Sequence, residues 1–153
     1  MMKLVAVGNR FMKDDGIAIA VAESLENRLS HLGLRILIGE TDCQSSYYLL
    51  NKDDFVFILD ALYMGAEPGS VHVLNLEEVM SQPSDSFMQH DMSMIELMKL
   101  YGDHLRGYMI GIEVAEIGFG DELSPVLRDK LPQICLEIEN SIKKIILEEK
   151  AYA

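Results

Sequence analysis

The sequence predicts an α/β fold, in which helices cover both faces of a mostly parallel sheet. Three observations predict it. Short runs rich in Val, Ile and Leu recur along the chain, and segments with helical periodicity separate them. The length of 153 residues suits one sizeable core but not two ordinary ones, so we expect a single domain over residues 1–153. Sheets of this kind bind ligands at the carboxyl ends of their strands.

The first third of the chain follows this alternation. KLVAVG (3–8) is expected to be a strand that is buried on both faces. Apolar residues then recur every four positions from Asp14 to about Leu29, which predicts an amphipathic helix with Asp14 as its N-cap. LRILIG (34–39) is expected to be the second strand, and SSYYLLNK (45–52) a short helix or turn.

The middle of the chain begins with its strongest strand pattern. DFVFILDA (54–61) contains five consecutive apolar residues and ends with a carboxylate. YMGAEPGS (63–70) has the composition of a turn, and VHVLNL (71–76) alternates as a strand that is partly open to solvent. SQPSDSFMQH (81–90) is expected to be a polar loop.

The last third predicts two helices and one strand. The first helix runs from Asp91 to Tyr101, and GYMIGIEV (107–114) is a further core strand. Ser124 is expected to cap a long helix whose first position is Pro125. The apolar face of that helix consists of Ile134, Ile138, Ile142 and Ile145, and residues 148–153 are expected to fray.

The charge balance limits the possible partners. Asp and Glu number 25 against 13 Lys and Arg, a net charge of −12, which disfavours nucleic acid and anionic membranes. We find no signal peptide and no apolar run of the roughly 20 residues that span a bilayer. Cys43 and Cys135 lie in no metal-binding spacing, so we expect reduced, buried thiols and a cytoplasmic location.

The first strand–turn–helix corner, AVGNRFMKDDG (6–16), does not suit a phosphate. It lacks G-x-G-x-x-G, and two acids occupy the positive end of the predicted helix. A nucleotide-binding module is therefore a weak alternative. Two adjacent acids cannot both cap one helix, which makes Asp15 a candidate metal ligand. Asn9 is either a turn residue or part of a ligand-binding loop.

Two further candidates come from distant segments. Asp60 ends the most apolar strand, where it either caps the following loop or binds a ligand. His90 is expected at a junction between a loop and a helix, where a side chain can project into a cleft. With Asp15 they would form a site of two carboxylates and one imidazole, which suits nickel, zinc or iron(II).

Methionines cluster in the sequence around His90. Five of the ten lie there, and they are either core residues of the predicted helix or the adaptable wall of a groove for a flexible peptide. Both interpretations can hold together. The five are Met80, Met88, Met92, Met94 and Met98.

Four segments together resemble the hydrogenase maturation proteases, which process the large subunit of nickel–iron hydrogenases. AVGNRFMKDDG is similar to the family's G-N-x-x-x-x-D-[DE]-G, and ILDALYMGAEPGS is similar to its [IV]-D-A strand end and G-x-x-P-G-[ST] turn. QHDMSMIELM resembles its H-x-x-x-x-x-x-L-[LM] segment, and GIEVAEIGFGDELSP its late strand, glycine turn and L-S-P helix start. The resemblance covers nearly the whole chain.

The resemblance implies a fold, a site and an activity. The fold is a three-layer α/β sandwich with a twisted, mostly parallel sheet of five strands. The family's metal ligands fall on Asp15, Asp60 and His90, to which we also assign catalysis. The activity is that of a metal-gated endopeptidase, usually classed as aspartic-type, which removes the C-terminal extension of the large-subunit precursor after nickel insertion.

The expected partner is therefore that precursor, and the nickel belongs to the substrate. We expect no permanently bound cofactor, although zinc or cadmium can occupy the site in a crystal. No Ser–His–Asp, Cys–His or H-E-x-x-H arrangement is present, so no covalent nucleophile is assigned. The chain is expected to be a monomer. The alternative is a non-catalytic chaperone on the same fold that binds nickel or the precursor.

The sequence departs from the family pattern at two places. The family has D-G-G-[ST] after its second strand, where this chain has IGET (38–41). Glu40 or Asp42 is a candidate to replace the missing acid. A helix glycine of the family is Ala18 here, which we interpret as a packing difference.

Overall fold

The computed structural model describes residues 1–81, 94–102 and 104–151. His90, most of the predicted loop 81–90 and the predicted helix start at Asp91 lie outside these residues. The elements are β1 (Met2–Val7), a 3-10 helix η1 (Lys13–Gly16), α1 (Ile17–His31), β2 (Leu34–Glu40), α2 (Cys43–Tyr48), β3 (Phe55–Leu62), β4 (Val71–Asn75), α3 (Leu76–Met80), α4 (Met94–Tyr101), β5 (Arg106–Glu113) and α5 (Pro125–Ala151).

The five strands form one sheet in the order β2-β1-β3-β5-β4. Neighbouring strands are parallel except β4, which runs antiparallel to β5. The chain crosses from β1 to β2 on one side and then returns to place β3 on the other side of β1. The order of the strands therefore reverses between β1 and β3, and ligands of α/β sheets commonly bind at this position.

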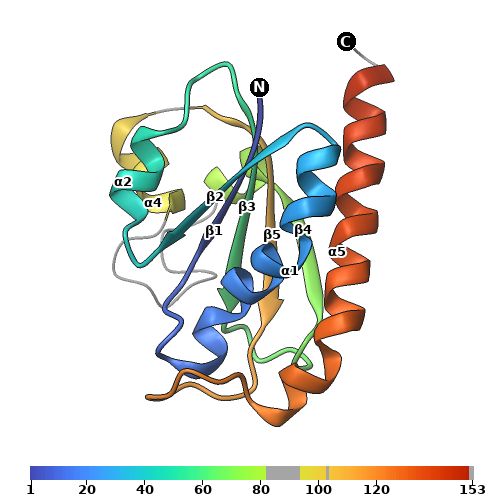
Figure 1. The fold of residues 1–153 in the computed structure, drawn as a ribbon. Helices are drawn as coiled ribbons and strands as arrows, with labels where there is room; N and C mark the ends of the chain where they lie inside the picture. The colour runs from blue at the N-terminus through green and yellow to red at the C-terminus, as the bar shows by residue number, and fades with distance from the viewer. Residues whose placement is uncertain (82–93, 103, 152–153) are drawn as a thin grey trace.

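Helices cover both faces of the sheet, which confirms the predicted α/β sandwich of three layers (Figure 1). Side chains of β1 alternate between two cores. Leu4 and Ala6 pack in the core that contains the buried faces of α1 and α5. Val5 and Val7 pack in the core that contains residues of α2, α3 and α4. The apolar run of β1, residues 4–7, is thus buried on both faces, as its continuous hydrophobicity predicts.

The predicted strands are all present, with small differences at their ends. Ser124 precedes α5 and its Oγ accepts a hydrogen bond from the Leu127 backbone N–H at 3.3 Å, as predicted for a cap. The predicted fraying of 148–153 is wrong up to Ala151, where α5 ends. Glu149 lies within this helix and binds Arg106. The short helix α3 was not predicted, because five residues are too few to show helical periodicity.

The start of α1 also differs from the prediction. The residue before α1 is Gly16, and no side chain caps the helix. Asp14 instead lies in the preceding 3-10 turn and is fully buried. Its carboxylate binds another segment of the chain, described below. Among the described residues, no helix combines the length and the apolar composition that a membrane span requires.

Candidate metal-binding site

Asp15 lies at the carboxyl end of β1, within the turn that leads to α1. It is buried, and both of its oxygens accept hydrogen bonds. The Asn9 backbone N–H donates to Oδ2 at 2.9 Å, and the Tyr63 hydroxyl donates to Oδ1. Donors on two sides fix the plane of the carboxylate. A carboxylate is an acceptor of hydrogen bonds and also a common ligand of divalent cations.

Asp60 reaches the same edge of the sheet from the neighbouring strand. In the β1–β3 register Ala6 is opposite Leu59, so Asp60 is level with the last residue of β1. Asp60 is buried, and its Oδ1 accepts a hydrogen bond from the Ala61 backbone N–H at 2.8 Å. The structure thus brings Asp60 and Asp15 to one edge, and it also supports the local, loop-binding role that the sequence left open for Asp60.

Two neighbouring side chains respond to the negative charge of this edge. Burial raises the pKa of the Cys43 thiol to about 11, and the charges of Asp60, Asp42 and Asp15 contribute. Burial also raises the pKa of Tyr63, together with its hydrogen bond to Asp15. Cys43 is therefore a neutral thiol near pH 7, which does not suit an activated nucleophile. It is only partly buried, unlike Cys135, so the predicted burial is correct for Cys135 alone.

Asp14 has a structural role beside Asp15. Its carboxylate accepts four hydrogen bonds from residues 115–124, the loop between β5 and α5. The donors are the Ala115 backbone N–H at 3.0 Å, the Glu116 N–H at 2.7 Å, and the N–H and hydroxyl of Ser124, each at 2.8 Å. Asp14 therefore ties this loop to the turn that carries Asp15, which explains why two acids are adjacent.

Asn9 is a turn residue, one of the two roles that the sequence left open. Its side-chain oxygen accepts a hydrogen bond from the Phe11 backbone N–H at 3.0 Å. This bond closes the turn after β1 and orients the Asn9 N–H toward Asp15. Asn9 thereby supports the candidate ligand through its backbone.

Sequence reasoning missed two residues of this edge, Tyr63 and Glu113. Glu113 ends β5 and is buried, and both of its oxygens lie close to the Met64 backbone N–H, at 3.1 and 3.0 Å. It thereby holds the segment that carries Tyr63. An acid at the end of an apolar strand was a usable signal for Glu113, as it was for Asp60. Nothing in the sequence links Tyr63 to Asp15, because 48 positions separate them.

The third predicted ligand, His90, lies outside the described residues. Within the described part of the chain, no three His, Cys, Asp or Glu side chains form a group that could hold a metal ion. The two carboxylates that the structure brings to the edge would therefore need a further donor, and His90 remains a prediction for it.

The residues at the family departures have local roles. Asp42 caps α2 by accepting a hydrogen bond from the Ser45 backbone N–H at 2.9 Å. Glu40 binds Arg10 on the surface. Ala18 is fully buried in the core beneath α1, in agreement with a packing role. Glu40 and Asp42 therefore have local contacts, and the replacement of the missing family acid by one of them stays a prediction.

Two of the five methionines, for which the sequence left a core role and a groove wall open, are core residues. Met94 and Met98 are buried in α4 and pack under the sheet. Met80 packs against the same core and is partly exposed. Because Met94 and Met98 are buried in the core, they do not form the wall of a groove. Met88 and Met92 lie outside the described residues.

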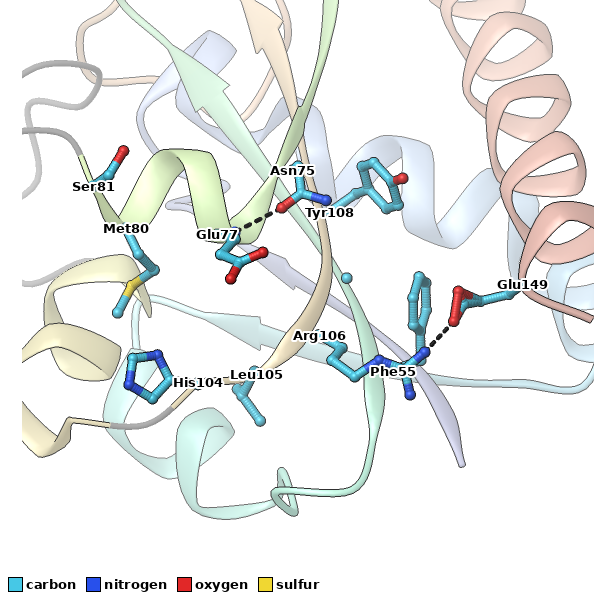
Figure 2. Close-up of a pocket in the computed structure, with 11 residues that line it drawn as sticks. Phe55, Asn75, Glu77, Met80, Ser81, His104, Leu105, Arg106, Tyr108 and Glu149 are labelled. Carbon is cyan, nitrogen blue, oxygen red and sulfur yellow. Dashed lines mark hydrogen bonds and ion pairs between the residues drawn. The ribbon is translucent and has the colours of Figure 1, made fainter. Parts of the chain in front are cut away.

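A cleft of about 610 Å³ lies at the opposite end of the sheet, where β3 and β5 begin (Figure 2). Arg106 and Glu149 form an ion pair on one side of it. Met80 and His104 lie on the other side. Neither Asp15 nor Asp60 lines this cleft, so we do not assign it to the candidate metal-binding site.

Comparisons with known proteins identify the fold and the family of this chain. The family model of HycI, a hydrogenase maturation protease, matches residues 19–141. The solved structure of the nickel–iron hydrogenase maturation protease HybD from Thermococcus kodakarensis has a TM-score of 0.71 and 26% identity, covering 92% of this chain and 98% of that one. HybD from Escherichia coli has a TM-score of 0.72 and 17% identity, covering 94% and 93%, which shows the fold alone.

A curated protein from Methanocaldococcus jannaschii is also similar. Its name assigns it provisionally to the hydrogenase maturation proteases. It is 25% identical over 148 residues, which are 94% of this chain and 90% of that protein. The family model covers well over half of the chain. The chain belongs to the hydrogenase maturation protease family.

Proposed function

We propose that this protein is an endopeptidase that removes the C-terminal extension of a nickel–iron hydrogenase large-subunit precursor once nickel has been inserted. Membership of the family supports peptidase activity on a hydrogenase precursor. The observation that carries the finer proposal is the pair of buried carboxylates, Asp15 and Asp60, at the edge between β1 and β3.

The chemistry of these side chains supports recognition of a cation. Carboxylate oxygens and an imidazole form a donor set that suits a borderline divalent ion such as nickel. In this proposal Asp15, Asp60 and His90 bind the nickel of the precursor. Because the ion is fixed in the substrate, its capture aligns the adjoining C-terminal segment, and a precursor without nickel is not aligned.

Hydrolysis then requires a base that accepts a proton from the attacking water and returns it to the amine nitrogen as the peptide C–N bond breaks. Asp15 and Asp60 are the carboxylates that we assign to this step, and nickel in the substrate can polarise the scissile carbonyl. The neutral thiol of Cys43 disfavours a covalent route at that residue. Asp15 and Asp60 therefore serve both binding and catalysis in this proposal.

The experiment compares cleavage of a nickel-loaded precursor by the wild type and by Asp15→Asn, Asp60→Asn and His90→Ala. Mass spectrometry of the large subunit records the loss of the extension. We expect the wild type to cleave only the nickel-loaded form, and each variant to lose cleavage by at least a hundredfold. Asp53→Asn is the matched control, because Asp53 is an exposed acid just before β3, at the other end of the sheet.

Two outcomes would contradict parts of the proposal. Retained cleavage in a variant would remove that residue from the site. Binding of the loaded precursor by the wild type without any cleavage would show a chaperone on this fold instead of a peptidase. Circular dichroism of each variant checks that it is folded.

A further inference from the structure

Two loops at the carboxyl edge of the sheet expose large apolar side chains. Phe119, between Gly118 and Gly120, is 92% exposed, and Ile117 in the same loop is 46% exposed. Phe11, in the loop after β1, is 64% exposed. Single exposed apolar residues are ordinary on protein surfaces. Here two aromatic residues belong to loops that lie side by side, although about a hundred positions separate them in the sequence (Figure 1).

Backbone hydrogen bonds hold the two loops together. The Gly120 N–H donates to the Phe11 carbonyl at 2.9 Å, and the Lys13 N–H donates to the Gly120 carbonyl at 2.9 Å. A third bond joins the Asp14 N–H to the Glu116 carbonyl at 3.2 Å. With the four bonds of the Asp14 carboxylate, these contacts anchor the loop on both sides of Phe119. The exposed ring is therefore presented on a supported backbone, which reduces the entropy lost when a partner binds it.

Acidic residues outnumber basic residues around these two loops. Residues 115–122 contain three carboxylates, Glu116, Asp121 and Glu122, and no basic residue. The cations of the first loop are engaged with acids of the chain, since Lys13 pairs with Glu116 and Arg10 with Glu23 and Glu40. Arg128 of α5 also lies close to this surface, 3.6 Å from Glu122. Five acids therefore stand against three cations, Arg10, Lys13 and Arg128, so the surface around the phenylalanines is apolar with an acidic border, and the whole chain carries a net charge of −12. A complementary partner segment is apolar and flanked by basic residues.

We propose that residues 9–13 and 115–122 form a docking surface for an apolar, basic-flanked segment of the precursor. This inference rests on the proposed function, because it takes the precursor as the partner. Asp14 joins the docking loop to the turn that holds Asp15, so the substrate is bound at two connected places. The buried acids bind its nickel, and the loops bind polypeptide outside the nickel site, which supplies affinity and selects among precursors.

The experiment measures steady-state cleavage of a nickel-loaded precursor by Phe11→Ser/Phe119→Ser. Buried aromatic anchors dominate protein interfaces, so we expect KM and the Kd for the precursor to rise about tenfold or more. The kcat is expected to stay within twofold, and the Kd for free Ni²⁺ is expected to be unchanged. Leu147→Ser is the matched control, because Leu147 is 70% exposed but lies near the end of α5, at the opposite end of the molecule (Figure 1).

A second variant tests the acidic border. Asp121→Asn/Glu122→Gln removes two charges from the loop and is expected to raise KM several-fold and to weaken its dependence on salt concentration. Unfolding in urea checks that each variant retains wild-type stability. A KM that responds to the charges but not to the phenylalanines would overturn the apolar part of the proposal.

The outcomes separate this inference from the proposed function. If the wild type cleaves the precursor and the double phenylalanine variant has the same KM and Kd, the docking surface is wrong and the peptidase function stands. If the wild type binds the precursor without cleaving it, the peptidase function is wrong, and the Kd values still decide the docking surface. If the wild type does not bind the precursor, both are wrong.

Discussion

The two ends of the central sheet hold buried carboxylates in different ways. At the amino end, Asp54 is buried against Lys3, with Nζ and Oδ2 2.6 Å apart. At the carboxyl end, the Asp14 carboxylate accepts hydrogen bonds from three peptide N–H groups and one hydroxyl. The Glu113 carboxylate accepts hydrogen bonds from the Met64 N–H. The first arrangement cancels charge within the chain, and the second orients charge without cancelling it.

This difference indicates a structural role for the amino end of the sheet and a binding role for its carboxyl end. An ion pair that is complete within the chain has little to offer a ligand, so Lys3 and Asp54 are best understood as structural. Burial raises the pKa values of Cys43 and Tyr63, and the negative charges of Asp15 and Asp60 at the carboxyl end raise them further. A cation supplied by another molecule would be stabilised there. The following predictions test this contrast, from the largest expected effect to the smallest.

Replacement of Asp14 should have the largest effect on stability. Asp14→Ala removes four hydrogen bonds to a charged group and leaves the two buried donors of Ser124 unsatisfied, so we expect the free energy of unfolding to fall by about 4 kcal/mol. Urea denaturation followed by circular dichroism measures it. Asp53→Ala, at an exposed acid, is the control and should change stability by less than about 0.5 kcal/mol. A loss below about 1 kcal/mol for Asp14→Ala would show that the loop is held by other contacts.

Removal of the lysine at the other end should have the next largest effect. Lys3→Met removes the nearer of the two cations that pair with the buried Asp54 and leaves the Met1 ammonium 3.6 Å from Oδ1, which should cost about 3 kcal/mol at pH 7. The pKa of Asp54 is lowered in the folded protein, because the hydrogen bond and charge of Lys3, with the Asn51 N–H, outweigh the effect of burial. The contribution of the pair is therefore complete above the unfolded-state pKa of about 3.9 and is lost as the pH falls through the lower folded-state value.

The same reasoning gives the pH dependence of this variant. Denaturation of the wild type and Lys3→Met between pH 7 and pH 2 should show a difference in stability that shrinks below about pH 4, as Asp54 becomes protonated. A difference that does not depend on pH would mean that the lysine stabilises the fold by packing instead of by charge.

A smaller effect is expected on cation binding from Tyr63. Tyr63→Phe removes the hydroxyl that orients Asp15, and loss of such a supporting group typically weakens metal affinity by about tenfold, or about 1.4 kcal/mol. Titration calorimetry with Ni²⁺ measures the affinity, and Tyr48→Phe, at an exposed tyrosine of α2, is the control. Equal affinity in the wild type and Tyr63→Phe would show that Asp15 is oriented without the phenol.

The smallest effect is expected at the cap of α5. Ser124→Ala removes one of the four bonds to Asp14 and the cap of the Leu127 N–H, so we expect a loss of about 1 kcal/mol. Thermal unfolding measures it, and Ser124→Thr should recover most of the loss because it restores the hydroxyl. An effect as large as that of Asp14→Ala would mean that this hydroxyl dominates the anchoring of the loop.

The sequence by itself determined the layers of this protein. The continuous apolar runs of β1, β3 and β5 and the four-residue spacing in α1 and α5 specify which elements are buried, because hydrophobic periodicity is a local property. It also selected Asp15, since two adjacent acids cannot both cap one helix, and Asp60, since an acid at the end of a buried strand needs a partner. Because these predictions rely on hydrophobic periodicity, the sequence could not locate η1 or α3, which are too short to show a periodic pattern.

Only the tertiary structure decided which of two adjacent acids anchors the chain. The sequence favours Asp14 as the helix cap, but its partners are residues 115–124, which lie a hundred positions away. The pairing of Tyr63 with Asp15 likewise depends on where β3 ends relative to β1. A side chain's hydrogen-bond partners are set by the crossing of distant segments. Local pattern therefore predicts that an acid is buried, and the fold determines what it binds.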